Sequence, residues 1–187
     1  MTIRAARPQD AGAVAAIYNA GMAERQATFE TRPRAPDEIV GWFDNGLPFI
    51  VAEDGDGSVV GFARVTPYSD RPFYAGVGEH TVYVDAAARA QGLGRRLLEE
   101  PAAEAERRGM YKLTSRIFTT NAASRAVHRA AGFAEVGVKR FHGRLDGEWK
   151  HCVLVERLLG DAAAATDDSA DGGGSSYRED HASESRR

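Results

Sequence analysis

Apolar and polar positions divide the chain into strands and helices that follow one another in an irregular order. Alternating or continuous apolar runs predict strands at residues 3–6, 49–53, 59–66, 79–84, 112–117, 133–140 and 150–158. Apolar positions at helical spacing predict helices at residues 8–21, 37–43, 92–108 and 122–131. This order is not the strict repetition of a doubly wound fold, so it predicts an α/β fold with helices packed on a mixed sheet.

Glycine and proline positions predict the connections between these elements. Residues 54–57 predict a hairpin turn, residues 67–78 predict a loop, and a loop rich in charge and glycine is expected between the last two strands. Pro101 lies inside the predicted helix 92–108, where a proline removes a backbone hydrogen bond at a cost of about 3 kcal/mol. We therefore expect a kink at Pro101, or a helix that breaks and restarts there.

The composition changes sharply after residue 160. Residues 161–187 are small, polar and charged, and they contain no Leu, Ile, Val or Phe. Such a segment cannot bury enough apolar surface to offset the entropy lost on ordering, so we expect a disordered, acidic, low-complexity tail. Residues 1–160 are long enough to form one domain with one core.

Composition also excludes several classes of protein. No apolar run approaches the roughly 18 residues of a membrane span, and the first residues lack the apolar core of a signal peptide. The single cysteine, Cys152, excludes an internal disulfide and favours a reducing, cytoplasmic setting. Residues 1–160 carry 21 basic and 20 acidic side chains, which gives no basic footprint for a nucleic acid. No metal site is expected, because His142 and His151 lack partner acids at metal-ligand spacing.

A glycine-rich turn follows the predicted strand 79–84. The segment Arg89-Ala90-Gln91-Gly92-Leu93-Gly94-Arg95 leads directly into a helix, whose first backbone N–H groups and dipole favour a phosphate. The third glycine of a dinucleotide fingerprint and the Lys of a P-loop are both missing, which leaves coenzyme A as the common remaining ligand. The alternative is a strand-to-helix turn that needs glycine for structural reasons alone.

Two motifs carry a resemblance to a known family over roughly residues 2–159. The turn Arg89-x-x-Gly92-x-Gly94 resembles the acetyl-CoA-binding motif of the GNAT N-acetyltransferases, and residues 121–133 resemble the second helix motif of that family. Residues 17–19, 28–29, 79–84 and 142–149 resemble the branch that acetylates phosphinothricin and arsinothricin. The resemblance implies a mostly antiparallel twisted sheet with helices on both faces, a splayed central strand and a homodimer.

The resemblance also implies which residues hold the acetyl-CoA co-substrate. Backbone N–H groups of the splayed strand, at Val82, Tyr83 and Val84, are expected to hold the oxyanion. The turn and one asparagine are expected to contact the remainder of the cofactor, and these residues are Ala90, Gln91, Gly92, Leu93, Gly94, Arg95 and Asn121. Asn121 is equally suited to cap the following helix. Ala90 and Gln91 depart from the family, which usually has glycine and a basic residue there. Ala90 fits the turn if its φ is negative, and at most weaker cofactor binding is expected.

Two side chains are candidates for proton transfer. An α-amino group is mostly protonated at pH 7 and must lose a proton before it attacks a thioester. The resemblance implies Glu79 as the general base; the alternative is a strand-end carboxylate in solvent or in an ion pair. It implies His128 as the acid that protonates the departing thiolate, because His128 lies two helical turns from Asn121 on the same face. The alternative is a structural histidine.

Arginines and aromatic residues are the candidates for substrate binding. A guanidinium matches phosphinate, arsinate and carboxylate groups bidentately. The candidate residues are Phe29, Arg71, Phe73, Tyr74 and Arg116. Cys152 is interpreted as a core residue, and Lys139 and Arg140 as a solvated charge pair.

These observations predict an acetyltransferase acting on the α-amino group of a small toxic amino-acid analogue. Arsinothricin, phosphinothricin and methionine sulfoximine are the expected substrates, acetylation would confer resistance, and the amine would attack directly in a ternary complex. No nucleic acid or membrane partner is expected. One alternative is an enzyme of the same fold acting on a protein N-terminus, a polyamine or an aminoglycoside. Another is a non-catalytic acyl-CoA-binding module.

Overall fold

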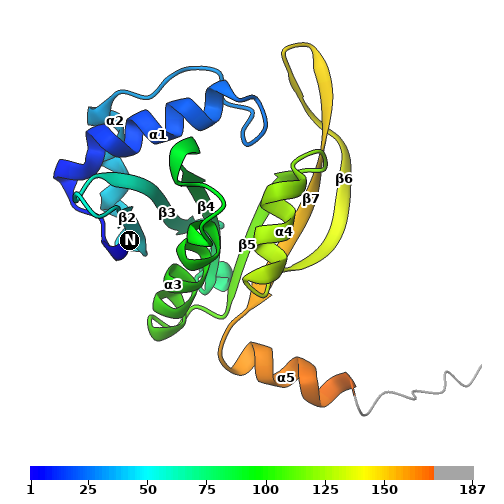
Figure 1. The fold of residues 1–187 in the computed structure, drawn as a ribbon. Helices are drawn as coiled ribbons and strands as arrows, with labels where there is room; N and C mark the ends of the chain where they lie inside the picture. The colour runs from blue at the N-terminus through cyan, green and yellow to red at the C-terminus, as the bar shows by residue number, and fades with distance from the viewer. Residues whose placement is uncertain (171–187) are drawn as a thin grey trace, which may run out of the picture.

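The computed structural model describes residues 1–170, and a seven-stranded sheet forms its centre (Figure 1). The strands lie in the order β1-β2-β3-β4-β5-β7-β6, and all neighbours pair antiparallel except β4 and β5. Their bounds are Thr2–Ala5 (β1), Phe49–Glu53 (β2), Val59–Pro67 (β3), Val77–Val84 (β4), Lys112–Phe118 (β5), Ala134–Leu145 (β6) and Glu148–Leu158 (β7). The mixed, mostly antiparallel sheet confirms the predicted fold class.

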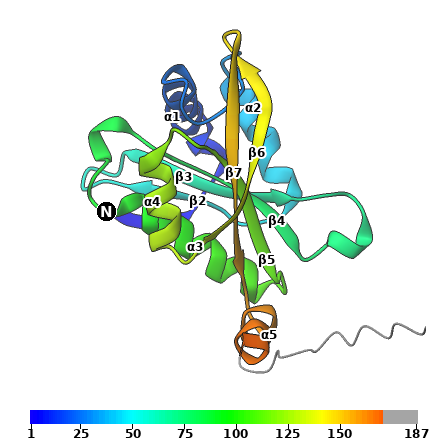
Figure 2. The same cartoon turned by 90° about the vertical axis from the view of Figure 1, so that its right-hand side faces the viewer.

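Helices cover both faces of this sheet. The α-helices are Ala11–Ala23 (α1), Pro36–Val40 (α2), Leu93–Arg107 (α3), Ala122–Ala130 (α4) and Asp161–Ala170 (α5). Short 3-10 turns are Pro8–Asp10 (η1), Gly41–Asn45 (η2), Pro72–Tyr74 (η3) and Ala86–Ala88 (η4). Neighbouring residues of β2 point to opposite faces, so Val51 packs with α1 while Ile50 packs with α3. Figure 2 shows α3 and α4 together on one side of the sheet.

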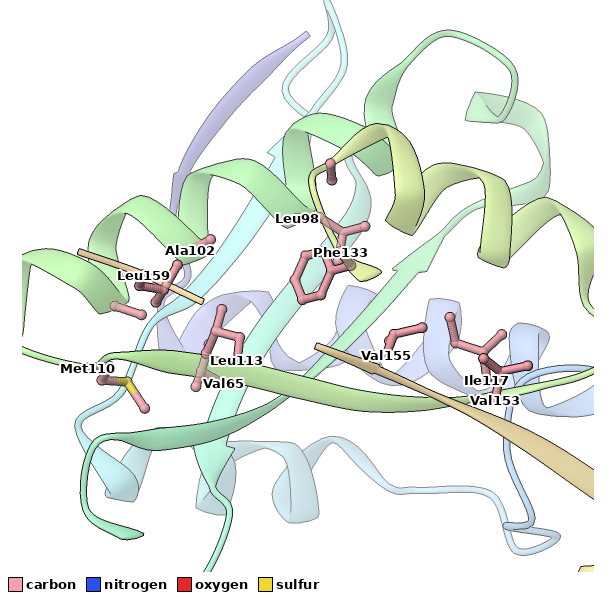
Figure 3. Packing of buried hydrophobic residues seen from close by; sticks show 12 residues of the cluster. Val65, Leu98, Ala102, Met110, Leu113, Ile117, Phe133, Val153, Val155 and Leu159 are labelled. Carbon is pink, nitrogen blue, oxygen red and sulfur yellow. The ribbon is translucent and has the colours of Figure 1, made fainter. Parts of the chain in front are cut away.

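The largest apolar cluster joins α3 and the residues that follow α4 to strands β3, β5 and β7 (Figure 3). Leu98 from α3, Leu113 from β5, Phe133 at the end of α4 and Val155 from β7 are all almost fully buried in it. This core fixes the positions of β5 and α4 relative to α3. It therefore also fixes the walls of the space that opens beside β4.

The two central strands separate part-way along their length. β4 pairs with β5 only from Val77 to Glu79, whereas it pairs with β3 as far as Val84. β5 in turn stays paired with β7 as far as Phe118. The two strands therefore diverge beyond Glu79, and the β5-facing edge of β4 has no strand partner there. This is the splayed central strand that the resemblance implied.

The connection between the last two strands differs from the expected loop. β6 and β7 run to Leu145 and Glu148 and form a long hairpin that extends beyond the other strands (Figure 1). The turn residues Asp146 and Gly147 both have positive φ, of 50° and 83°. An Asp-Gly pair is a strong signal for a two-residue hairpin whose two central residues need positive φ. The expected loop was wrong because its charged residues lie on an exposed strand.

A kink or a break was expected at Pro101, and the structure excludes the break. α3 is one helix from Leu93 to Arg107, with Pro101 buried inside it. Burial of the neighbouring Leu97, Leu98 and Ala102 offsets the lost hydrogen bond.

The expected tail begins with α5, so its first ten residues are helical rather than disordered. A run of alanines favours a helix, and an aspartate at its start suits the helix dipole. Residues 171–187 lie outside the described residues.

Candidate active site

Two cavities meet where β4 and β5 diverge. The first, of about 310 Å³, lies between β4, β5, α4 and the segment after α1. The second, of about 580 Å³, lies between β5, the β6–β7 pair and the loop that contains η3. Glu79, Ser115 and Arg116 line both cavities. The two cavities therefore share part of their walls at these three residues.

Glu79 is the carboxylate at this junction. Its Oε1 accepts hydrogen bonds from Arg116 Nη2 at 2.5 Å and Nε at 3.2 Å. Its side chain stays 30% exposed, so it remains accessible to a ligand. The ion pair that sequence reasoning gave as the alternative for Glu79 is therefore present.

The second cavity is rich in positive charge. Four basic side chains line it, namely Arg71, Lys112, Arg116 and Lys139, against the two acids Glu79 and Glu156. Lys112 pairs with Glu156 and Arg116 pairs with Glu79. Arg71 and Lys139 have no carboxylate partner within residues 1–165. The two unpaired cations suit an anionic ligand.

Lys139 is a residue whose role sequence reasoning missed. It was interpreted as part of a solvated pair with Arg140, but it lines the second cavity, whereas Arg140 lines neither cavity. Burial, together with the charges of Lys139 and Arg116, lowers the pKa of His142, which lines the first cavity. The predicted strand 133–140 already contained both residues, but alternation along a strand does not say which of its two faces lines a cavity.

His128 lies in the first cavity and its ring is only 3% exposed. Its Nδ1 lies 2.7 Å from the carbonyl oxygen of Ser124, one turn earlier in α4. Its Nε2 lies 2.9 Å from Nε2 of His80, which is itself 2% exposed. Burial lowers the pKa of both rings, and His128 lowers that of His80 further. Sequence reasoning missed His80, because only the fold brings β4 beside α4.

The glycine-rich turn has an exposed, open backbone. Gly92 precedes α3 with a φ of 73°, no side chain caps the helix, and a Cβ on Gly92 would meet no atom within 4 Å. The start of α3 therefore has no side-chain cap and leaves room beside Gly92, which suits an anion at a helix N-terminus. A Cβ on Gly94 would lie 3.3 Å from Val127, so that glycine is also needed for close packing of α3 on α4.

Ala90 in this turn contradicts the expected conformation. Its φ is +63°, not negative, so an alanine occupies the left-handed region that favours glycine. A non-glycine residue there costs roughly 1–2 kcal/mol. Gly92, two residues later, also has a positive φ, so the turn contains two residues in the left-handed region. This backbone strain arises because the chain has alanine at position 90 of the turn, where glycine would adopt the same φ without cost.

The arginines of the turn already have partners. Arg89 pairs with Glu24 at 2.7 Å and donates from Nε to the carbonyl oxygen of Val84. Arg95 pairs with Glu99 in the next turn of α3, at 2.7 Å. A phosphate beside the turn therefore meets exposed guanidinium groups that are held by surface ion pairs, which are weak.

The structure brings most of the predicted residues to the two cavities. Phe29, Glu79, Val82, Tyr83, Arg116, Asn121 and His128 line the first, and Arg71, Tyr74, Glu79 and Arg116 line the second. Phe73, Val84 and the turn residues Ala90, Gln91, Gly92, Leu93, Gly94 and Arg95 line neither of them. Asn121 caps α4, as its Oδ1 accepts from Ser124 N at 3.0 Å. Phe29 packs edge-on against Phe118, with ring centroids 4.8 Å apart.

Residues 1–170 hold neither a metal cluster nor a membrane-spanning helix. Among them, no group of three or more His, Cys, Asp or Glu side chains is placed to hold a metal ion. The helices of that part of the chain are too short or too polar to cross a membrane. Cys152 is buried against Phe118 and Leu145, and burial raises the pKa of its thiol.

The sequence matches the Acetyltransferase (GNAT) family over residues 15–133, which includes the turn and both strands of the splay. The chain belongs to the GNAT acetyltransferase family. This GNAT protein is 35% identical to a phosphinothricin N-acetyltransferase of Alcaligenes faecalis over 163 residues, which cover 84% of this chain and 82% of the relative. It is 35% identical to an L-methionine sulfoximine/L-methionine sulfone acetyltransferase of Pseudomonas aeruginosa over 165 residues, covering 84% and 94%.

A solved structure shares the same architecture. The GNAT superfamily phosphinothricin acetyltransferase of Sinorhizobium meliloti, solved in complex with acetyl-CoA, superposes with a TM-score of 0.83 at 30% identity. The match covers 87% of this chain and 90% of that one. The acetyltransferase class inferred from the two motifs is therefore confirmed, and the fold that the family resemblance implied is confirmed with it.

Proposed function

We propose that this GNAT protein transfers an acetyl group from acetyl-CoA to the α-amino group of a small amino acid with an anionic or strongly polar side chain. Phosphinothricin, arsinothricin and methionine sulfoximine are the proposed substrates. The observation that carries the proposal is the junction at Glu79, where a cavity beside the splayed strand meets a cavity with two unpaired cations. The relatives named for phosphinothricin and methionine sulfoximine support this substrate class.

The first cavity and the turn are the proposed binding site of acetyl-CoA. Acetyl-CoA supplies the activated thioester carbonyl. The uncapped start of α3 suits its pyrophosphate. The backbone N–H groups of Val82 and Val84 lie on the unpaired edge of β4 and are offered to the carbonyl oxygen, whereas that of Tyr83 faces β3. Phe29 and Asn121 line the cavity between them.

Glu79 is the proposed general base. It lies at the junction of the cavities, where it can take a proton from the substrate ammonium directly or through a water molecule. Arg116 keeps the Glu79 carboxylate oriented through two hydrogen bonds to one oxygen. The second oxygen, Oε2, accepts no hydrogen bond from residues 1–165 and is free to accept the proton.

His128 is the proposed second catalytic side chain and protonates the departing thiolate. In the resting geometry its Nδ1 faces the Ser124 carbonyl and its Nε2 faces His80, so the neutral ring directs no proton into the cavity. This role therefore requires the ring to gain a proton during turnover.

The second cavity is the proposed site for the acidic groups of the substrate. Arg71 is the proposed clamp, with Arg116 and Lys139 beside it and Tyr74 on the wall. Phe73 lies on the same loop but is 67% exposed and outside the cavity, so its contact with substrate is the weakest part of the predicted set. A polycation such as an aminoglycoside would meet repulsion here, which favours an anionic substrate over this alternative.

The test is acetyl-CoA-dependent thiol release with a panel of amines. We expect fast release with phosphinothricin, arsinothricin or methionine sulfoximine, and slow release with spermidine and an aminoglycoside. Arg71→Ala should raise KM for phosphinothricin far more than KM for an amine without an acidic side chain. Release with none of the amines, despite acetyl-CoA binding, would refute the substrate class and leave a binding module.

Resistance is the proposed consequence of the reaction. Acetylation removes the positive charge of the α-amino group, so the toxic analogue no longer presents the ammonium of an amino acid. Production of the protein in the cytoplasm of a sensitive bacterium should raise the phosphinothricin concentration that permits growth. An unchanged growth limit, with active protein present in the cells, would count against this role.

A homodimer is also proposed. The β6–β7 hairpin exposes apolar side chains, namely Val136, Val138, Phe141 and Trp149, each at least 45% exposed. Such a group on a protruding hairpin is typical of an interaction surface. Light scattering after size-exclusion chromatography should give about twice the chain mass of 20.2 kDa. A mass near 20.2 kDa at micromolar concentration would exclude the dimer.

A further inference from the structure

The paired rings of His80 and His128 admit only a few arrangements of their protons. The carbonyl oxygen of Ser124 can only accept a hydrogen bond, so at 2.7 Å the Nδ1 atom of His128 must carry a hydrogen. The two Nε2 atoms are 2.9 Å apart, which requires one hydrogen between them. If both rings are neutral, that hydrogen belongs to His80, and Nε2 of His128 accepts it.

The surroundings of the pair favour the neutral arrangement. Both rings are at least 97% buried, and Phe133 packs against them with ring centroids 4.6 and 5.4 Å away. The Nδ1 atom of His80 is buried and has no hydrogen-bond partner within residues 1–165. The backbone of Thr114 favours an additional proton on His80, but burial and the neighbouring His128 disfavour it more, so the pair resists protonation.

We propose that His80 is a positioning residue that holds His128 as the neutral, Nδ1–H tautomer in the resting protein. Donation from His80 to Nε2 of His128 stabilises the form of His128 that lacks a proton there. It also fixes the plane of the ring, since both nitrogens of His128 then have partners on opposite sides. The catalytic meaning of this control rests on the proposed function, but the proton arrangement itself does not.

Other charged and titratable groups also face the pair and enter any pH dependence. Those that line the same cavity are Tyr18 from α1, Glu30 after α1, Glu79 and Tyr83 from β4, Arg116 from β5, His142 from β6 and Cys152 from β7. Glu79 and His80 are neighbours on β4 and therefore point to opposite faces of the sheet. Both nevertheless line the first cavity, so Glu79 is one of the charged groups that can act on the pair.

The test is nuclear magnetic resonance of the full chain labelled with nitrogen-15 at its five histidines. Nitrogen–proton correlations distinguish the Nδ1–H from the Nε2–H tautomer. We expect His128 to be the Nδ1–H tautomer and to titrate below 6.5, the ordinary pKa of histidine. In His80→Phe, which keeps the ring volume but removes the donor, the pKa of His128 should rise by about one unit.

Two variants keep the proposal open to refutation. His80→Gln keeps an N–H donor at a similar reach, so it should shift the pKa of His128 less than His80→Phe does. An Nε2–H tautomer of His128 in the wild-type protein would overturn the proposal. An unchanged pKa of His128 in a folded His80→Phe would also overturn it. If His80→Phe does not fold, the proposal fails when His128 in His80→Gln shows the same mixture of tautomers as histidine in a peptide.

Activity provides a separate readout. With phosphinothricin at saturation, the pH dependence of kcat should move to higher pH in His80→Phe and only slightly in His80→Gln. An identical pH profile in all three proteins would assign His80 a purely structural role. If none of the panel amines is acetylated, the proposed function fails, and the resonance measurements still decide the role of His80.

Discussion

Replacing Ala90 by glycine should stabilise the protein. The φ of +63° at Ala90 costs an alanine roughly 1–2 kcal/mol relative to a conformation it prefers, and glycine avoids this cost. Glycine has more freedom in the unfolded chain, which returns about 0.4–1 kcal/mol. The net gain in the free energy of unfolding is therefore about 1 kcal/mol, equivalent to about 2–4 °C in Tm for a chain of this size.

Urea unfolding of wild type and Ala90→Gly measures this difference, and Gly92→Ala is the matched control. Gly92 has a φ of 73° and open space around it, so an alanine there adds the same strain without a clash and should lower stability by about 1 kcal/mol. Calorimetry with acetyl-CoA should show that Ala90→Gly binds at least as tightly as wild type. A less stable Ala90→Gly, with Gly92→Ala unchanged, would refute the strain assigned to this turn.

Two further predictions concern charge. Lys139→Gln should raise KM for phosphinothricin several-fold, because it removes an unpaired cation from the second cavity. Arg140→Gln is the control and should leave KM unchanged, because Arg140 lines neither cavity. Equal effects of the two substitutions would remove Lys139 from the site. Because burial lowers the pKa of His80 and His128 in the folded protein, the unfolded chain binds more protons below the ordinary pKa of 6.5. The free energy of unfolding should therefore fall with pH from about 6.5 downward, by up to about 1.4 kcal/mol per pH unit for each ring. Urea unfolding from neutral pH to about pH 5.5 should show a shallower fall in His80→Phe, and parallel curves would show that the pair does not titrate as described.

Local patterns were sufficient to predict most of the elements. The periodicity of residues 49–53 and 112–117, for example, reflects strands whose side chains alternate between two buried faces, and the strands lie where expected. The Asp146–Gly147 turn was missed although its signal is local, because charged residues on an exposed edge strand look like a loop. The first turns of α5 were missed because low hydrophobicity outweighed the helix propensity of the alanines.

The site was predictable only as far as the motifs reached. The turn at Gly92 and the carboxylate Glu79 were found from sequence, but the pairing of Glu79 with Arg116 joins residues 37 positions apart. The contact between His80 and His128 joins residues 48 positions apart and depends on how α4 packs against β4. The positive φ of Ala90 could not be predicted from the sequence motif, because alanine disfavours the conformation that it has in the turn. Such features depend on tertiary structure and need coordinates.

The central claim is that acetyl transfer takes place at Glu79, where the two cavities meet. The most direct test is kcat of Glu79→Gln with phosphinothricin and acetyl-CoA both saturating, with acetyl-CoA affinity measured alongside by calorimetry. Loss of a general base predicts that kcat falls about 10²–10⁴-fold while the Kd of acetyl-CoA stays the same. A kcat within a few-fold of wild type, in a variant that binds acetyl-CoA normally, would contradict the account.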